Sequence, residues 1–300
     1  MTNTPTTVHA SQAGTWTLGD LTVNRIGLGA MRLTGSSAFD LGTPSDRAVA
    51  VEVLHRAVEL GVNHIDTASF YFSRLRSANE LINTALAPYR EDLVVVTKVG
   101  PGRDPSGEWY TATPEQLRGQ VEENLRQLGR DHLDVVNLRR MSQDSIAEHF
   151  GVLAELRDAG LIRHLGVSNV TAEHLAQAQA IAPVVCVQNR FNLDVRRHDD
   201  VLRLCGEQGI AFVPFFAIAG EGRDRGVVAG AGESPQVREV ARAHGASVAQ
   251  VRLAWTLQQG PHVLAIPGTG NPDHLRANVA AGALRLTGQE MDLLDTVEAG

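Results

Sequence analysis

The sequence predicts one (β/α)8 barrel, a TIM barrel, with an N-terminal β-hairpin that caps it. Three observations favour this fold class. Apolar runs rich in β-branched residues and bounded by turn residues recur along the 300-residue chain. Segments of helical periodicity separate these runs, and such an alternation is typical of parallel strands covered by helices. Most of the runs are continuously apolar, which is typical of strands buried on both faces.

Eight of these runs are predicted to be the barrel strands. They lie at residues 25–29, 62–67, 93–99, 133–138, 162–167, 184–189, 211–216 and 263–267. Eight strand–helix units in about 275 residues match the usual size of this fold, roughly 250 residues. An open, doubly wound sheet is the alternative. It is disfavoured because no predicted strand is followed by the GxGxxG string of dinucleotide-binding sheets.

Turn and capping residues mark the helices between these strands. One helical segment spans 45–60 and is closed by Gly61, and another spans 145–159 and ends at Gly160. Thr113 followed by Pro114 has the pattern of an N-cap with proline in the first turn. The buried stripe of that helix is predicted to be Leu117, Val121, Leu125 and Leu128. Further helix starts are predicted at Thr171, at Asn271 with Pro272, and at the capping box of Thr287 and Glu290.

Three segments lie outside the strand–helix units. Residues 1–13 are polar and are predicted to be a mobile tail, so that the barrel domain spans 14–300. Residues 15–23 are predicted to form a hairpin that turns at Gly19-Asp20 and closes the barrel floor. Residues 220–232 are rich in glycine and are predicted to be a flexible loop, long enough to act as a lid. Arg223 and Arg225 in this loop either clamp a pyrophosphate or remain solvated.

The composition excludes several classes of protein. Hydrophobic residues make up 43% of the chain, and 27 Lys and Arg against 34 Asp and Glu give a formal net charge of −7. A chain with this charge and no dense basic run is poorly suited to binding nucleic acid. No apolar run approaches the roughly 20 residues of a membrane span, and the start lacks a secretory pattern. We therefore expect a cytoplasmic globular protein with no membrane or nucleic-acid partner, and composition leaves its oligomeric state open.

Metal and disulfide chemistry are not expected either. The two cysteines, Cys186 and Cys205, are too few for a disulfide framework or a zinc quartet. The 11 histidines show no metal-ligand spacing. Cys186 shares one strand face with Gln188 and is predicted to be a small core residue. His64 lies two residues before Asp66 and is predicted to be a buried, hydrogen-bonded histidine rather than a catalytic one.

Ionisable residues collect where the predicted strands end. In a barrel of this kind the reactive groups lie at the carboxyl ends of the strands. Asp66 ends the second strand, with Tyr71 shortly after it. Lys98 ends the third strand and Arg139 ends the fourth. If Asp66 points into the barrel, the alternation of side chains lets Lys98 and Arg139 point inward too. We therefore expect an acid, a phenol, a lysine and an arginine at one mouth.

This set of residues suits proton transfer from a phenol. The ordinary pKa of a tyrosine, about 10, is too high for an efficient acid at neutral pH. A buried ammonium group beside a phenol favours the phenolate and lowers that pKa, and Asp66 would keep Lys98 charged. The alternative is a buried Asp–Lys pair that only joins two strands. On these residues alone the two interpretations are equally supported.

Five motifs make the chain resemble the aldo-keto reductases. They are GVNHIDTASFY at 61–71, VVVTK at 94–98, GLIRHLGVSN at 160–169, VQN at 187–189 and AIPGT at 265–269. The resemblance runs in order from about residue 15 to 295 and implies the barrel fold. It also implies a cofactor, NADPH or NADP⁺, bound without a Rossmann fold. The family's catalytic Asp, Tyr and Lys correspond to Asp66, Tyr71 and Lys98.

The resemblance also implies which residues bind the cofactor. Ser168, Asn169 and Gln188 would hold the carboxamide, and Phe215 would stack on the nicotinamide. His274 and Thr269 would lie near the 2′-phosphate, with Arg276 as a weaker candidate. The full set is Gly29, Ala30, Met31, Ser168, Asn169, Gln188, Phe215, Phe216, Ala217, Ile218, Gly220, Gly268, Thr269, Gly270, His274 and Asn278.

One central position departs from the family pattern. The family has a catalytic histidine where this chain has Arg139. Arginine stays protonated and cannot shuttle protons, but it can donate hydrogen bonds to a carbonyl oxygen or an anion. The strings DVVNLR at 134–139 and VPFF at 213–216 are similar to those of the bacterial pyridoxal reductases within the family.

The resemblance therefore implies an oxidoreductase that uses NADPH to reduce an aldehyde or ketone to an alcohol. Reduction of pyridoxal to pyridoxine is the leading hypothesis. The alternatives are a reductase of a sugar or secondary-metabolite carbonyl, and a regulatory barrel that binds NADPH with little turnover. Arg139 in place of histidine is the feature that keeps the regulatory interpretation open.

Overall fold

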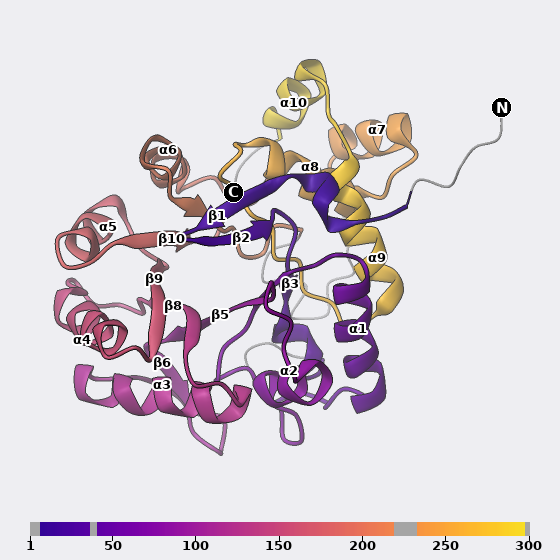
Figure 1. Ribbon diagram of the computed structural model, residues 1–300. Coiled ribbons are helices and arrows are strands. Elements are labelled where there is room, and N and C mark those ends of the chain that lie inside the picture. Colours follow the sequence, from indigo (N-terminus) through magenta and orange to yellow (C-terminus); the bar gives the residue numbers. More distant parts are fainter. Residues whose placement is uncertain (1–6, 37–40, 219–232, 298–300) are drawn as a thin grey trace.

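Seven parallel strands form one curved sheet in the order β11-β10-β9-β8-β5-β4-β3. The computed structural model describes residues 7–36, 41–218 and 233–297 (Figure 1). The strands of this sheet are β3 (Leu28–Gly29), β4 (His64–Asp66), β5 (Val94–Val99), β8 (Leu133–Arg139), β9 (Ile162–Ser168), β10 (Val184–Gln188) and β11 (Ala211–Phe212). The predicted barrel is confirmed.

The predicted eighth strand closes the barrel without forming a regular strand. Isolated parallel bridges join Ile26 to Ala265, Gly29 to Gly268, and Phe212 to Val263. The seam between first and last strand needs glycine, because a Cβ atom on Gly29 would lie 2.6 Å from the Ile266 carbonyl oxygen. We call the bridges from Ile26 to Ala265 and from Gly29 to Gly268 the closing seam.

Helices cover the outer face of the sheet (Figure 1). Their bounds are α1 (Arg47–Glu59), α2 (Ala78–Leu86), α3 (Pro114–Leu128), α4 (Ala147–Asp158), α5 (Ala172–Gln179), α6 (Asp199–Gln208), α7 (Pro235–His244), α8 (Val248–Gln258), α9 (Pro272–Ala280) and α10 (Gly288–Asp295). The predicted capping box at Thr287 is present, the predicted helix starts at Thr113 and Thr171 also have capping boxes, and Asn271 caps α9. Pro114 and Pro272 occupy the first turns of their helices.

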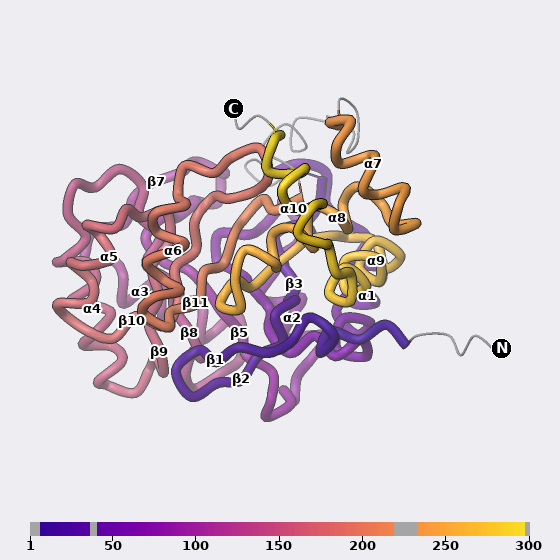
Figure 2. Tube along the Cα trace, turned by 90° about the horizontal axis from the view of Figure 1, so that it is seen from above, coloured from indigo at the N-terminus to yellow at the C-terminus, as the bar shows by residue number. Residues whose placement is uncertain are grey.

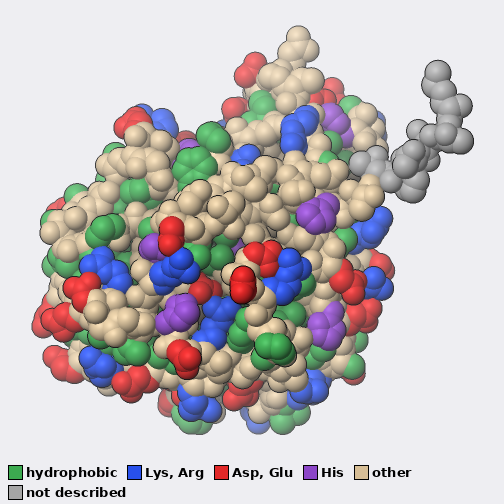
Figure 3. Space-filling view, in the orientation of Figure 1, with side chains coloured by type: hydrophobic (Ala, Val, Ile, Leu, Met, Phe, Trp, Pro, Cys, Tyr) green, Lys and Arg blue, Asp and Glu red, His purple; other side chains and the backbone are tan. Residues whose placement is uncertain are grey.

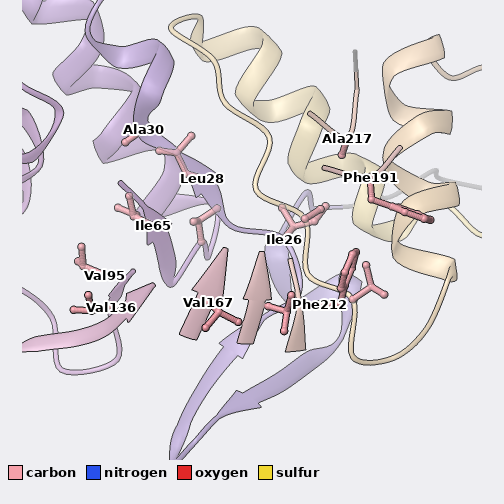
Figure 4. Packing of buried hydrophobic residues seen from close by; sticks show 14 of the residues in the cluster. Ile26, Leu28, Ala30, Ile65, Val95, Val136, Val167, Phe191, Phe212 and Ala217 are labelled. Atoms are coloured by element: carbon pink, nitrogen blue, oxygen red, sulfur yellow. The ribbon is translucent and has the colours of Figure 1, made fainter. Parts of the chain in front are cut away.

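The outward side chains of the strands pack against these helices. Ile65, Val95, Val136 and Val167 belong to this core and come from neighbouring strands (Figure 4). The residues directly before and after each of these in the strand point into the barrel, because side chains alternate between the two faces of a strand. The register sets Asp66 opposite Val96, Lys98 opposite Asn137, and Arg139 opposite Ser168. Inward polar residues of β4, β5 and β8 therefore reach the same end of the barrel.

The N-terminal hairpin closes the opposite end. It consists of β1 (Thr15–Leu18) and β2 (Leu21–Asn24), which turn at Gly19 with φ +67°. Leu18 and Val23 pack with the inward residues Val94, Val96 and Val135 in a second, smaller core. Figure 2 shows the hairpin at one end of the barrel and β7 near the other. The predicted floor is confirmed.

Part of the predicted tail is packed onto this floor. Ala10–Ala13 form a 3-10 helix, and the side chains of Ala10 and Ala13 are buried. The backbone N–H of Ala10 donates to the Leu60 carbonyl at 2.8 Å. Residues 10–13 therefore belong to the packed barrel rather than to a tail.

His64 lies in the barrel interior, one layer below Asp66. Its ring is 1% exposed, and Nδ1 lies 3.3 Å from the Asn24 carbonyl oxygen. Gly27 leaves the space for this ring, because a Cβ there would lie 2.3 Å from His64 Cε1. Burial lowers the pKa of His64 to about 4, although Asp66 and the Asn24 carbonyl oppose the shift. The predicted buried histidine is confirmed, and it is neutral at pH 7.

Two features bear on the surface of the molecule. Acidic and basic side chains are interspersed over the hairpin face, with no large patch of one sign (Figure 3). None of the helices in the described ranges combines the length and apolar character that a membrane crossing requires. The predicted glycine-rich loop at 220–232, with Arg223 and Arg225, lies outside the described residues.

A second hairpin, which the sequence pattern does not predict, stands at the barrel mouth. It consists of β6 (Pro101–Arg103) and β7 (Trp109–Thr111) and lies between β5 and α3. Arg103 holds it against the β4 loop, since its guanidinium donates to the Phe72 carbonyl at 3.1 Å and lies over the rings of Phe72 and Trp109.

Candidate active site

A buried ion pair stands at the centre of the barrel mouth. The ammonium nitrogen Nζ of Lys98 lies 2.5 Å from Asp66 Oδ1 and also donates to the Thr67 carbonyl at 3.0 Å. Lys98 is 1% exposed and Asp66 is 3% exposed. Burial by itself would lower the pKa of Lys98, but the charge of Asp66, together with Tyr71, raises it above its ordinary value. Lys98 is therefore a fixed cation at neutral pH.

Tyr71 lies beside this cation. Nζ of Lys98 is 4.9 Å from the centre of the Tyr71 ring. The ring is half-buried, packs against the main core and stands edge-on to Phe70 at 5.2 Å. The backbone N–H of Tyr71 donates to the Ala68 carbonyl at 3.0 Å, which is a tight turn directly after β4. The structure thus brings together Asp66, Tyr71 and Lys98.

Gln188 extends the ion pair across the mouth. Its Nε2 donates to Asp66 Oδ2 at 2.8 Å, so both carboxylate oxygens of Asp66 are bound. Within the part of the chain that the structure describes, Gln188 Oε1 is buried and has no hydrogen-bond partner. An unsatisfied buried acceptor costs free energy, about 1–3 kcal/mol, unless a ligand supplies the donor.

A carboxamide is a group that fits this acceptor. The –NH2 of a carboxamide can donate to Gln188 Oε1, and its oxygen can accept from a hydroxyl such as that of Ser168. Ser168 and Gln188 face each other in the register of β9 and β10. The predicted set for the nicotinamide end of the cofactor, Ser168, Asn169 and Gln188, therefore comes from adjacent strand ends and contains a donor–acceptor combination for that group.

Two residues that follow strand ends at the mouth have a left-handed backbone conformation. Asn169 has φ +61° and Phe216 has φ +62°, which is unusual for residues other than glycine. Side chains hold both in place. The Asn169 side-chain amide donates to the Arg140 carbonyl at 2.9 Å, and the Asn192 amide donates to the Phe216 carbonyl at 2.9 Å. Strain of this kind is typical of functional sites.

Arg139 lies across the mouth rather than against the ion pair. Its Nη1 is 3.4 Å from Ser168 Oγ, and its guanidinium carbon is 5.0 Å from the centre of the Phe215 ring. Arg140, the next residue, is directed away and donates to the Gln143 carbonyl at 2.6 Å. The alternation of inward and outward side chains predicted for this strand end is confirmed.

A buried amide network supports the ion pair from outside the sheet. Thr67 and Thr97, each adjacent in sequence to one member of the pair, donate to Asn79 and Asn124 at 2.7 and 2.6 Å. The Asn79 amide joins the two by donating to Asn124 Oδ1 at 2.9 Å. All four of these side chains are fully buried. The network fixes the strand ends that carry Asp66 and Lys98.

A cleft of about 500 Å³ lies beside the closing seam. It is lined by the predicted cofactor residues Gly268, Thr269, Gly270 and His274, and also by Arg32. Asn271 Oδ1 accepts from the backbone N–H groups of Asp273 and His274, so the cap of α9 already uses those donors. Arg276 does not line the cleft. Arg32 is absent from the predicted site, although its position right after Met31 could have indicated it.

The remaining predicted cofactor residues fall into three groups. Gly29 belongs to the closing seam, and Ala30 and Met31 begin the 3-10 helix Ala30–Leu33 that follows it. Phe216, Ala217 and Ile218 follow Phe215 after β11, with Ala217 buried and Ile218 packed against the core. Asn278 is buried in α9, one turn after His274. Gly220 lies outside the described residues.

The chain matches a family of known proteins. The Aldo/keto reductase family model matches residues 25–299. A pyridoxine 4-dehydrogenase of Escherichia coli (strain K12) is 44% identical over 293 residues, which cover 95% of this chain and 98% of that protein. An uncharacterized oxidoreductase of Schizosaccharomyces pombe is 38% identical over 290 residues, covering 96% of this chain and 91% of that protein.

Solved structures share the fold. An aldo-keto reductase from Klebsiella pneumoniae, crystallised in complex with NADPH, matches with a TM-score of 0.75 at 29% identity. The match covers 91% of this chain and 90% of that chain.

Proposed function

This chain belongs to the aldo/keto reductase family and is therefore an oxidoreductase, and we propose that it reduces an aldehyde or ketone to the alcohol with NADPH, pyridoxal being the leading substrate. The observation that carries the proposal is the position of Tyr71 beside the buried, charged Lys98. The NADPH of the related structure from Klebsiella pneumoniae supports the choice of cofactor.

The cofactor, when bound, supplies a hydride to the carbonyl carbon. Ser168, Asn169 and Gln188 would hold its carboxamide, since Gln188 Oε1 lacks a donor among the described residues. Phe215 would receive its ring, and the cleft at Gly268, Thr269, Gly270 and His274 would receive its adenosine end. Gly29, Ala30, Met31, Phe216, Ala217, Ile218, Gly220 and Asn278 complete the proposed cofactor set.

Tyr71 donates the proton that the substrate oxygen needs. Loss of that proton leaves a phenolate, and the Lys98 ammonium beside the ring stabilises this anion. Asp66 keeps Lys98 charged through its Oδ1. Gln188 donates to the other carboxylate oxygen, Oδ2, so the orientation of the Asp66 carboxylate is set by both neighbours. The buried amides Asn79 and Asn124 are positioning residues, because they hold the strand ends rather than touch the substrate.

Arg139 gives the site its substrate preference. A partly buried guanidinium such as that of Arg139 is stabilised by an anion or several acceptors. Pyridoxal has an ionisable phenol next to its aldehyde, so one planar guanidinium can bind both oxygens. The relative named pyridoxine 4-dehydrogenase, at 44% identity, supports this substrate for the present chain.

The test is steady-state oxidation of NADPH with pyridoxal, with benzaldehyde and with aldose sugars. We expect pyridoxal to give the highest kcat/KM. Higher kcat/KM with a sugar would contradict pyridoxal as the substrate. Tight binding of NADPH with no turnover of any carbonyl would contradict the enzymatic proposal and support a regulatory barrel.

A further inference from the structure

The guanidinium of Arg139 lies on the same two groups that the proposed function gives to the nicotinamide. One of its nitrogens contacts the Ser168 hydroxyl at 3.4 Å, and its central carbon lies over the Phe215 ring at 5.0 Å. In the proposed function the hydroxyl binds the carboxamide and the ring face receives the nicotinamide. Arginine and nicotinamide therefore compete for the same surface.

The charge of Arg139 is not balanced by a neighbouring acid. Asp66 is committed to Lys98 and Gln188, through both of its carboxylate oxygens. Between residues 7–36, 41–218 and 233–297, no carboxylate forms an ion pair with Arg139. The Asp66–Lys98 pair sums to zero, so Arg139 adds a net positive charge to the mouth, and arginine keeps that charge at all ordinary pH values.

A nicotinamide that stacks on Phe215 must displace this guanidinium. The displaced side chain stays close, because it is attached at the end of β8 and its backbone is paired with Ser168. Because the backbone of Arg139 stays in place, its positive charge remains at the mouth when the nicotinamide binds. Two like charges a few ångströms apart at a partly enclosed site repel each other more strongly than they would in bulk water.

The two redox states of the cofactor differ in this ring. The nicotinamide ring of NADP⁺ carries a positive charge, and the ring of NADPH is neutral. We propose that Arg139 makes this site discriminate between them, weakening the binding of NADP⁺ relative to NADPH by charge repulsion at the ring. This inference rests on the proposed function, since it requires that a nicotinamide cofactor binds here.

The experiment is a titration of protein fluorescence with NADPH and with NADP⁺, each in the absence of substrate. The quantity compared is the ratio of the two dissociation constants in wild type, Arg139→Met and Arg139→Lys. We expect Arg139→Met to lower the ratio Kd(NADP⁺)/Kd(NADPH) at least tenfold, which is about 1.4 kcal/mol. Arg139→Lys keeps the charge and should keep most of the ratio.

Two controls locate the effect at the ring. Arg140→Met removes the neighbouring arginine, which is directed away from the mouth, and should leave the ratio unchanged. Adenosine 2′,5′-bisphosphate lacks the nicotinamide, so its Kd should be the same for wild type and Arg139→Met. Raised salt should reduce the wild-type ratio, because screening weakens a charge effect at a solvent-accessible mouth.

The outcomes separate the two proposals. Failure of wild type to bind either dinucleotide would contradict the proposed function and this inference with it. Binding of both dinucleotides with a ratio that Arg139→Met leaves unchanged would overturn the inference alone. An equal fall in the ratio for Arg140→Met would also overturn it, because the effect would then be a general property of the surface charge.

Discussion

Lys98 and Asp66 form an ion pair inside the barrel, with Nζ and Oδ1 2.5 Å apart and neither side chain more than 5% exposed. Such a pair is balanced only while both charges are present, since removal of one leaves the other buried without a partner. The pair therefore links the stability of the barrel to the chemistry at its mouth.

The first prediction tests this link. Lys98→Met should lower the free energy of unfolding in urea by about 3–5 kcal/mol, because it leaves the Asp66 carboxylate buried and uncompensated. The double variant Asp66→Asn with Lys98→Met should recover part of the loss. Arg90→Met is the matched control, because it removes an exposed pair with Asp92 that is worth about 0–1 kcal/mol. If Lys98→Met and Arg90→Met lower the free energy of unfolding by the same amount, the prediction is wrong.

A second prediction concerns the general acid. Tyr71→Phe should cut kcat for pyridoxal reduction by about 10² to 10⁴, because the proton donor is lost. The Kd for NADPH should change little, since the phenol is assigned to the substrate oxygen. Tyr110→Phe is the control, because Tyr110 is exposed on the β6–β7 hairpin. Near-normal turnover in Tyr71→Phe would show that another group supplies the proton.

The pH dependence of stability provides a third prediction. His64 has a pKa of about 4 when folded, against 6.5 when unfolded. Between these values the unfolded chain binds more protons than the folded one, so stability falls as the pH drops through this window. The expected loss between about pH 7 and pH 4 from this group is about 3 kcal/mol.

The measurement is the free energy of unfolding against pH for wild type and His64→Asn. The variant should show a shallower slope between about pH 6.5 and pH 4, whatever its stability at neutral pH. His274→Gln changes an exposed histidine and should leave the slope as it is in wild type. Parallel slopes for wild type and His64→Asn would mean that other groups dominate acid destabilisation.

Substrate selection by Arg139 is a fourth prediction. Arg139→Met should lose kcat/KM for pyridoxal at least tenfold more than for benzaldehyde, a difference of about 1.4 kcal/mol in transition-state binding. The physical reason is that only pyridoxal offers a second oxygen to the guanidinium. Arg139→His should shift the preference toward simple aldehydes. If the ratio of the two kcat/KM values stays constant in both variants, another residue selects the substrate.

The fifth prediction concerns the choice between NADPH and NADH. Arg32 and His274 line one cleft and can meet a 2′-phosphate, but few cations are present, so we expect a modest preference for NADPH. Arg32→Gln should reduce the ratio Kd(NADH)/Kd(NADPH) several-fold, as expected for loss of one charge-assisted contact. Arg276→Gln, on α9 but not lining the cleft, serves as the control. Equal Kd values for both cofactors in wild type would refute the preference.

Strand positions could be predicted because a short, continuous apolar run is typical of a strand that is buried on both faces. The run at 263–267 lies in the barrel where a strand is predicted, yet its pairing is limited to isolated bridges. Tight backbone approach at Gly29 and Gly268 decides that pairing, and apolar periodicity does not report it. The β6–β7 hairpin could not be predicted because proline and glycine, here Pro101 and Gly102, are typical of loops. In addition, Trp109 and Tyr110 are exposed, so β7 has no buried face that would indicate a strand.

The candidate site shows a similar division. Asp66, Lys98 and Arg139 could be placed at one mouth from strand parity alone. The contact of Arg139 with Phe215 could not, because it joins side chains 76 positions apart whose separation depends on sheet curvature. Asn79 and Asn124 were also missed, since a polar residue on a helix is usually solvated and only the fold reveals that these two are buried.

The closing seam has a consequence for how the chain is made. Its bridges join residues 26 and 29 to residues 265 and 268. The first strand therefore cannot pair with the last one until the end of the chain has been synthesised. A nascent chain that stops short of residue 263 has two bare sheet edges, along β3 and β11. Bare edges promote association between chains, and contacts of such long sequence separation form late. Ribosome-stalled or C-terminally truncated forms should therefore aggregate rather than persist as partial barrels, and chaperone capture should end when the last quarter emerges.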